Sequence, residues 1–217
     1  MFIVEKEPKS IAAESYRTLR TNLQYSSFDE EYKVIVVTSS EPGEGKSTTA
    51  GNLALSISQG DKKVVLIDCD LRKPSLHKKF GLSNTVGLSD VIVGKESVSV
   101  VGHRYNNNLT VLTSGKIPPN PAEMLGSKSM KALIEALKKV FDYVILDTPP
   151  VQAVADAQIL STRADGTLIV VRAEKTKKDS VLNTVNLLKK VNANIIGTIL
   201  NGVDTKKNDY YYYYGDK

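Results

Sequence analysis

One segment of the chain, residues 40–47, has the residue types and spacing needed to hold a phosphate group. It reads Ser-Glu-Pro-Gly-Glu-Gly-Lys-Ser and fits the pattern G-x-x-x-x-G-K-[ST], except that its first residue is serine. Gly43 and Gly45 permit backbone angles that other residues resist, so successive amide N–H groups can converge on phosphate oxygens at a helix N-terminus. Lys46 supplies a cation for β- and γ-phosphates, and the Ser47 hydroxyl can ligate Mg²⁺.

Two further segments place carboxylates where a phosphate-bound metal ion would need them. The apolar run 64–67 ends in Asp68, with Asp70 two residues on, and the run 143–146 ends in Asp147. Strands of an open α/β sheet bind ligands at their carboxyl ends. We expect Asp147 to hold Mg²⁺, directly or through water, and Asp68 to bind metal or activate a nucleophile. An acid after a strand is more often a turn former or helix cap, and the phosphate loop is what favours the metal site.

The elements that must position these residues alternate along the chain. Short apolar runs rich in β-branched residues, typical of strands covered on both faces, occupy residues 34–37, 64–67, 109–112, 143–146, 168–171 and 195–200. Helical patterns lie between them, notably at residues 46–59, 128–140 and 179–191. We therefore expect a single α/β domain over residues 1–217, with a doubly wound, mostly parallel sheet of the P-loop NTPase type.

Both ends of the chain depart from this alternation. Residues 9–26 predict a separate N-terminal helix, in which Ile11, Leu19 and Leu23, separated by multiples of four residues, face the core. Residues 203–217 show no core-forming period, contain five consecutive tyrosines and are expected to form a flexible tail.

Composition narrows the class of protein further. The chain has 217 residues, 41% of them hydrophobic, and its net charge of +5 is compatible with phosphate ligands, nucleic acid or an anionic membrane. The basic residues are dispersed, which favours a solvated basic surface. No apolar run reaches the roughly 18–20 residues of a membrane span, so we expect a soluble intracellular protein. The single cysteine, Cys69, cannot form an internal disulfide, in agreement with a reducing compartment.

Three more motifs accompany the phosphate loop. The pattern D-x-D-x-R follows the second apolar run, E-x-x-R-x-x-R lies in the N-terminal helix, and the tyrosine cluster ends the chain. The residues concerned are Asp68, Asp70 and Arg72; Glu14, Arg17 and Arg20; and Tyr210, Tyr211, Tyr212, Tyr213 and Tyr214. The combination, from about residue 9 to the end, closely resembles the bacterial tyrosine kinases of capsule and exopolysaccharide systems, which are related to MinD and ParA.

The resemblance implies an ATP- and Mg²⁺-dependent kinase that phosphorylates its own tail and regulates polysaccharide synthesis and export. Tyr210 to Tyr214 would be the phosphoacceptors, and Glu14, Arg17 and Arg20 would form a charged stripe that joins subunits into a ring. The implied catalytic residues are Lys46, Asp68, Asp70 and Asp147, with Asp68 as the general base. The implied metal ligands are Ser47, Asp68 and Asp147. The implied cofactor-binding residues are Gly43, Glu44, Gly45, Lys46, Ser47, Thr48 and, at the adenine, Asn201, although an Asn-Gly pair is equally well explained as a turn.

The resemblance also implies partners. They are a transmembrane activator that holds the kinase at the inner face of the plasma membrane, a cognate phosphotyrosine phosphatase and other protein substrates, with no nucleic acid expected. MinD and ParA relatives carry a lysine where this chain has Glu41. That departure argues against the main alternative, an ATPase switch that positions cargo or binds DNA. A second alternative is a nucleotide-binding adaptor whose N-terminal helix docks on a membrane protein.

Overall fold

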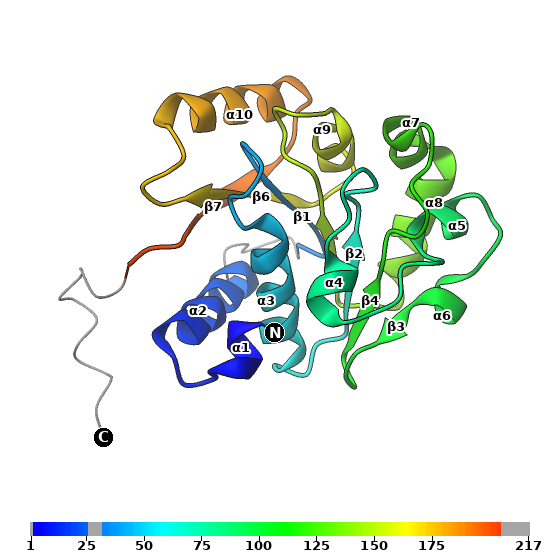
Figure 1. Cartoon of the computed structure of the whole chain (residues 1–217), viewed down its shortest axis with the longest axis horizontal. Helices are drawn as coiled ribbons and strands as arrows, with labels where there is room; N and C mark the ends of the chain where they lie inside the picture. The colour runs from blue at the N-terminus through cyan, green and yellow to red at the C-terminus, as the bar shows by residue number, and fades with distance from the viewer. Residues whose placement is uncertain (1, 26–31, 205–217) are drawn as a thin grey trace.

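The computed structural model describes residues 2–25 and 32–204, so the tyrosine cluster and most of the expected tail lie outside the described residues. A seven-stranded sheet with the order β3-β4-β2-β5-β1-β6-β7 runs through the molecule (Figure 1). All neighbours in it are parallel except β3 and β4. The strands are β1 Val34–Ser39, β2 Val64–Asp68, β3 His103–Arg104, β4 Leu109–Leu112, β5 Tyr143–Asp147, β6 Gly166–Arg172 and β7 Ile195–Asn201.

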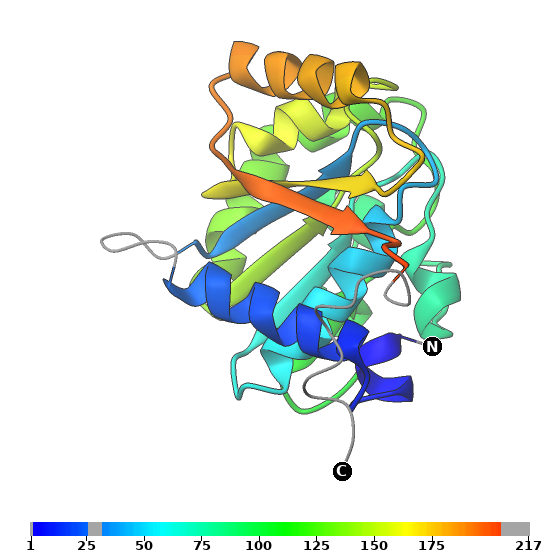
Figure 2. The ribbon, with the colours of Figure 1, turned by 90° about the vertical axis from the view of Figure 1, so that its left-hand side faces the viewer.

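Helices cover both faces of the sheet. Figure 2 shows α9 and α10 on one face and α1 and α2 on the other. Within the described residues the helices are α1 Ile3–Lys6, α2 Ile11–Tyr25, α3 Lys46–Ser58, α4 Leu76–Phe80, α5 Leu88–Ile92, α6 Val98–Val101, α7 Pro121–Gly126, α8 Lys128–Leu137, α9 Asp156–Ser161 and α10 Lys178–Lys190. The expected doubly wound α/β architecture is confirmed.

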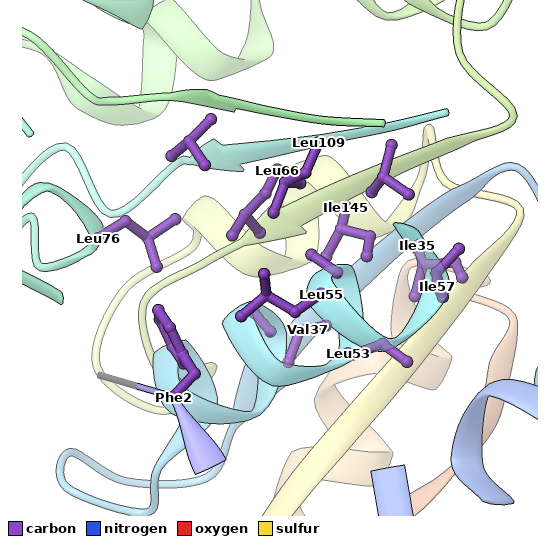
Figure 3. Close-up of a cluster of buried hydrophobic side chains, with 14 of the residues drawn as sticks. Phe2, Ile35, Val37, Leu53, Leu55, Ile57, Leu66, Leu76, Leu109 and Ile145 are labelled. Atoms are coloured by element: carbon purple, nitrogen blue, oxygen red, sulfur yellow. The ribbon is translucent and has the colours of Figure 1, made fainter. Parts of the chain in front are cut away.

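The period of two along each strand divides the core into two layers. In β1, Ile35 and Val37 point to the face covered by α3, whereas Val34 and Val36 join the cluster formed with α8. Figure 3 shows the first layer, in which Leu53 and other apolar residues of α3 pack against the strands. Because both faces are covered, the central strands are apolar at nearly every position, which is why continuous apolar runs located them correctly.

The helix that begins at Lys46 is almost entirely buried. It lies between the sheet and the N-terminal helices, and the ring of Phe2 packs on it so closely that a Cβ at Gly51 would lie 2.2 Å from that ring. Tyr16 and Leu19 of α2 are packed against the same core layer. The helix that follows the phosphate loop is therefore held in place by packing against the sheet and the N-terminal helices.

One expectation about the N-terminal helix is wrong. Ile11 is 39% exposed, whereas Leu23 is buried and Ala13 takes a buried position that the apolar spacing did not indicate. Residues four apart are offset by about 40° around a helix, so Ile11 and Leu23 differ by about 120° and cannot share one narrow face.

Short elements were not anticipated from the sequence. The helices α1, α4, α5, α6, α7 and α9 have four to six residues each, and β3 has two. A single helical turn is too short to show an amphipathic period, so tertiary packing decides whether it forms. Among the residues that the structure describes, no helix combines the length and apolarity needed to cross a membrane.

Candidate active site

The predicted phosphate loop joins β1 to α3 and has the backbone geometry that its glycines permit. Gly43 has φ +83° and Gly45 has φ +96°, both in the left-handed region that side chains disfavour. At Gly45 there is also no room, because a Cβ would lie 2.0 Å from Nδ2 of Asn201. The helix starts at the next residue, Lys46, so the backbone N–H groups of its first turn, which have no acceptor within the helix, are available to a ligand at the loop.

The Glu44 side chain is turned into the loop. It is 2% exposed, and its Oε2 accepts hydrogen bonds from the backbone N–H groups of Ser40, at 2.8 Å, and Glu41, at 3.0 Å. The Thr176 hydroxyl donates to Oε1 of the same carboxylate. These bonds stabilise the curvature of the loop. Because they occupy the carboxylate, the cofactor contact predicted at Glu44 would have to come from its backbone.

Asn201 is brought to the loop from the far end of the chain. Its Nδ2 donates a 2.9 Å hydrogen bond to the backbone carbonyl of Glu44. The residue that follows, Gly202, has φ +71°, so the Asn-Gly pair also makes the turn that the sequence allowed. A contact between Asn201 and adenine stays a prediction. What the structure shows is that the hydrogen bond from Asn201 to Glu44 anchors the phosphate loop to β7.

The Lys46 side chain lies over the acidic end of the sheet. Its Nζ is 3.4 Å from Oδ2 of Asp70, and both side chains are largely buried. Ser47 is 6% exposed, while the Thr48 hydroxyl accepts a 2.9 Å hydrogen bond from Nζ of Lys79 on α4. The loop lysine and the D-x-D-x-R segment are thus in direct contact through Asp70.

The two predicted strand-end acids lie side by side. Asp68 and Asp147 are register partners on the neighbouring parallel strands β2 and β5. Asp68 is fully held by backbone donors, because Oδ1 accepts from Asp70 N at 3.2 Å and Oδ2 accepts from Ser75 N at 3.0 Å and Leu76 N at 2.9 Å. The start of α4 therefore fixes the orientation of this carboxylate.

Asp147 has the opposite environment. It is completely buried, and neither of its oxygens accepts a hydrogen bond from any described residue. A buried carboxylate without partners is costly, so such an atom pair calls for an explanation. Bound Mg²⁺ or its water shell would satisfy both oxygens, and in this respect the residues present fit the metal that the sequence implies.

Burial raises the pKa of both acids. The pKa of Asp68 is raised to about 7, first by desolvation and then by the charge of Asp147, against the backbone hydrogen bonds from Leu76 and Ser75. The pKa of Asp147 is raised to about 6 by desolvation, while the Lys46 charge and the proximity of the Ser47 hydroxyl, which does not reach hydrogen-bond geometry with either oxygen, lower it. The pair therefore titrates near neutral pH, where a general base is most useful.

The pattern D-x-D-x-R leads to an acid that sequence reasoning missed. Nε of Arg72 is 3.0 Å from Oδ2 of Asp156, and Nη2 is 3.1 Å from Oδ1, a bidentate pair. Asp156 is completely buried at the start of α9, beyond the loop that follows Asp147. The pair therefore ties the loop after β2 to the loop after β5. An acid in the first turn of a short helix gave no signal beyond that of a cap.

The residues of the N-terminal motif already have partners within this chain. Nη1 of Arg17 is 2.7 Å from Oε2 of Glu14, and Nη2 donates to the Pro8 carbonyl at 2.6 Å. Nη1 of Arg20 donates to the Ser56 carbonyl in the last turn of α3, at 2.7 Å. Arg20 therefore departs from the uniform charged stripe that we expected, because its side chain turns toward α3. The role of the three residues in oligomerisation stays a prediction.

The described part of the chain holds no group of three or more His, Cys, Asp or Glu side chains arranged to bind a metal. A metal here would depend on few protein ligands, with phosphate and water oxygens completing the coordination, which is the habit of Mg²⁺. The geometry can therefore bind a polyphosphate beside a metal-binding carboxylate and a second acid with a raised pKa. That combination is the one that phosphoryl transfer requires.

Comparison with known proteins agrees with the class that this fold and site define, the P-loop NTPases. The ParA family model described as "NUBPL iron-transfer P-loop NTPase" matches residues 31–209. Tyrosine-protein kinase YwqD of Bacillus subtilis (strain 168) is 49% identical over 216 residues, which cover 99% of this chain and 91% of the relative. Putative tyrosine-protein kinase CapB of Staphylococcus aureus is 36% identical over 215 residues, covering 98% of this chain and 94% of that protein.

A solved structure gives the same result. The kinase domain of Escherichia coli tyrosine kinase ETK superposes with a TM-score of 0.91 and 34% identity, over 98% of this chain and 84% of that one. The chain thus belongs to the ParA-type P-loop NTPases and, within them, to the family of bacterial tyrosine-protein kinases. Members of the P-loop class bind nucleotides, which agrees with the loop between β1 and α3.

Proposed function

We propose that this chain is an ATP-dependent tyrosine kinase that transfers the γ-phosphoryl group of Mg·ATP to the tyrosines of its own C-terminal segment, Tyr210 to Tyr214. The observation that carries the proposal is the convergence of Lys46, Asp68 and Asp147 at one sheet edge beside the glycine loop. Family membership supports the same activity.

Nucleotide binding would use the loop amides and Lys46 for the phosphates. Bound Mg²⁺ would neutralise charge on the β- and γ-phosphates, and Ser47, Asp147 and Asp68 are its proposed ligands. Asp147 fits this role best, because its buried oxygens accept no hydrogen bond from the residues that the structure describes. Asp70 keeps Lys46 beside the acids, because its Oδ2 lies 3.4 Å from the lysine Nζ.

Asp68 is the proposed general base. A tyrosine phenol has a pKa near 10, so it needs an acceptor for its proton as its oxygen attacks the γ-phosphorus. The new P–O bond forms while the bond to the ADP oxygen breaks, and the phenolic proton goes to Asp68. Its raised pKa of about 7 strengthens it as a base, and the backbone donors of α4 hold it in place.

Mass spectrometry of the C-terminal segment after incubation with ATP and Mg²⁺ tests this function. We expect phosphate on one or more of Tyr210 to Tyr214 in the wild type and none in Lys46→Met, which loses the phosphate-binding cation. An unmodified wild-type segment, together with slow ATP hydrolysis and salt-sensitive DNA binding, would instead establish the ATPase switch.

The biological setting is also part of the proposal. We infer that the kinase acts in capsule or exopolysaccharide synthesis and export, assembles into a ring through Glu14, Arg17 and Arg20, and is held at the inner membrane face by a transmembrane activator. A phosphotyrosine phosphatase would reverse its modification, and other proteins would be substrates. The family likeness supports these partners, with no nucleic acid among them.

Charge predicts how modification affects assembly. Each phosphotyrosine adds about −1.5 to −2 at neutral pH, so a multiply modified segment repels itself and any acidic site it occupied. We expect phosphorylation to loosen the oligomer. Light scattering before and after complete phosphorylation measures this, and an assembly of unchanged size would contradict it.

A further inference from the structure

The loop between β6 and α10, residues 173–177, is attached directly to the phosphate loop. The Thr176 hydroxyl donates to the Glu44 carboxylate and accepts the backbone N–H of Arg172 at 2.9 Å. The Ala173 N–H donates to the carbonyl of Asn201 at 2.9 Å, and Asn201 in turn donates to the Glu44 carbonyl. These bonds fix the position of the β6–α10 loop relative to the glycines of the phosphate loop.

Lys175 of this loop reaches over the phosphate loop. Its Nζ lies 4.0 Å from the position that a Cβ would take on Gly43, and it is the nearest atom outside the loop in that direction. Gly43 has φ +83°, and outside its chain neighbours a Cβ there would meet no atom of the described residues within 4 Å except the Lys175 ammonium, so the space between the two is open. Over residues 2–25 and 32–204, no carboxylate lies within ion-pair distance of Lys175.

A cation beside the phosphate loop would offset several negative charges. The loop contains two carboxylates, Glu41 and Glu44, and a triphosphate bound beside them brings several more negative charges. Glu44 is engaged inside the loop, and Glu41 is drawn toward α10, where its Oε1 accepts a 2.7 Å hydrogen bond from the Ser180 hydroxyl. Lys46 already has an acidic neighbour in Asp70. Lys175 is positioned to balance the remaining charge.

We propose that Lys175 is a phosphate-binding residue that supplies a second cation to the polyphosphate of the nucleotide at Gly43. The inference rests on the proposed function, because it takes a nucleoside triphosphate as the ligand of the loop. It deepens that function by adding to the site a residue outside the phosphate-loop and acidic motifs. An exposed ammonium on a flexible side chain binds phosphate as a point charge, so its contribution is moderate and sensitive to salt.

Calorimetric titration with a non-hydrolysable ATP analogue and, separately, with inorganic tripolyphosphate tests the proposal. We expect Lys175→Met to weaken binding of both ligands about tenfold at low salt, and Lys175→Arg to stay within about threefold of the wild type. The difference between wild type and Lys175→Met should shrink as ionic strength rises, because added salt screens exposed charges.

Lys177→Met is the matched control. Lys177 is an exposed lysine of the same loop, two residues away, so the variant removes the same charge and should change either dissociation constant less than about twofold. The inference would be overturned if both lysine variants bound the ligands equally more weakly, or if Lys175→Met bound them as tightly as the wild type. In either case the wild type would still bind nucleotide, so the proposed function would stand. A wild type that bound neither ligand would overturn the proposed function together with this inference.

Discussion

The ends of β2 and β5 carry two acids that look equivalent in the sequence and differ completely in the structure. Asp68 accepts three backbone hydrogen bonds, whereas Asp147 is equally buried and accepts none from the described residues. The first carboxylate is satisfied by the fold, and the second is left for a ligand. The difference teaches that the fold itself satisfies one carboxylate, whereas only the proposed metal would satisfy the other.

Replacing the unpartnered acid should give the largest loss of activity. Asp147→Ala is expected to lower tail phosphorylation about 10³-fold, because the proposed metal ligand is gone. Stability should change little, because relief of the buried, desolvated carboxyl offsets the loss of its attraction to Lys46 and Ser47. Phosphotyrosine formation and thermal unfolding at pH 6 measure the two effects. A marked drop in melting temperature would show that Asp147 is a structural acid after all.

The partnered acid should combine a smaller loss of activity with a loss of stability. Asp68→Ala is expected to reduce phosphorylation about 10²-fold and to cost about 1–3 kcal/mol at pH 6, because three backbone donors lose their acceptor. At that pH the wild-type carboxyl is largely protonated, given its pKa of about 7, so little charge is relieved by the change. If Asp68→Ala unfolded at or above the melting temperature of Asp147→Ala, the contrast between the two acids would be wrong.

The bidentate pair between the two strand-end loops should have an intermediate effect. Asp156→Asn keeps one oxygen for Arg72 but loses the charge, so we expect kcat to fall about tenfold while KM for ATP changes less than about twofold. Arg163→Met is the control, because Arg163 donates to the Leu125, Gly126 and Ser127 carbonyls away from the acids. If both variants lose only stability, the pair does not position the acids.

Stability in the absence of nucleotide and Mg²⁺ should also depend on pH. Both acids have pKa values raised above 3.8, to about 7 and about 6, so the folded state binds more protons than the unfolded state in this window. Their stabilising contribution is complete below about pH 4 and is lost as the pH rises through 6 and 7.

Titration of these two acids should therefore lower the melting temperature of the protein as the pH rises from 5 to 8. The decline should be shallower in a double variant that carries Asp68→Asn and Asp147→Asn. An identical pH profile in the wild type and the double variant would show that the two carboxyls titrate alike in the folded and unfolded states.

Much of the architecture was readable from local patterns. The runs that became β1, β2, β4, β5 and β6 were continuous and apolar, because strands covered on both faces have no solvent side to encode. The run that became β7 lies at the sheet edge, where no position is fully buried. The helix at Lys46 began where expected, since glycine backbone freedom and the start of a helix are local properties. Ile11 was misplaced, because a four-residue spacing over twelve residues overestimates the width of a buried helical face.

The sequence by itself determined the phosphate loop, the order of the longer strands and helices, the acids at two strand ends and the family likeness. Each depends on neighbouring residues, whose spacing fixes backbone angles or periodicity. Only the tertiary structure decided that β2 lies beside β5, so that Asp68 and Asp147 become register partners. It also brought Asn201 and Lys175 to the phosphate loop. Such contacts follow from the packing of whole layers, which no local spacing specifies.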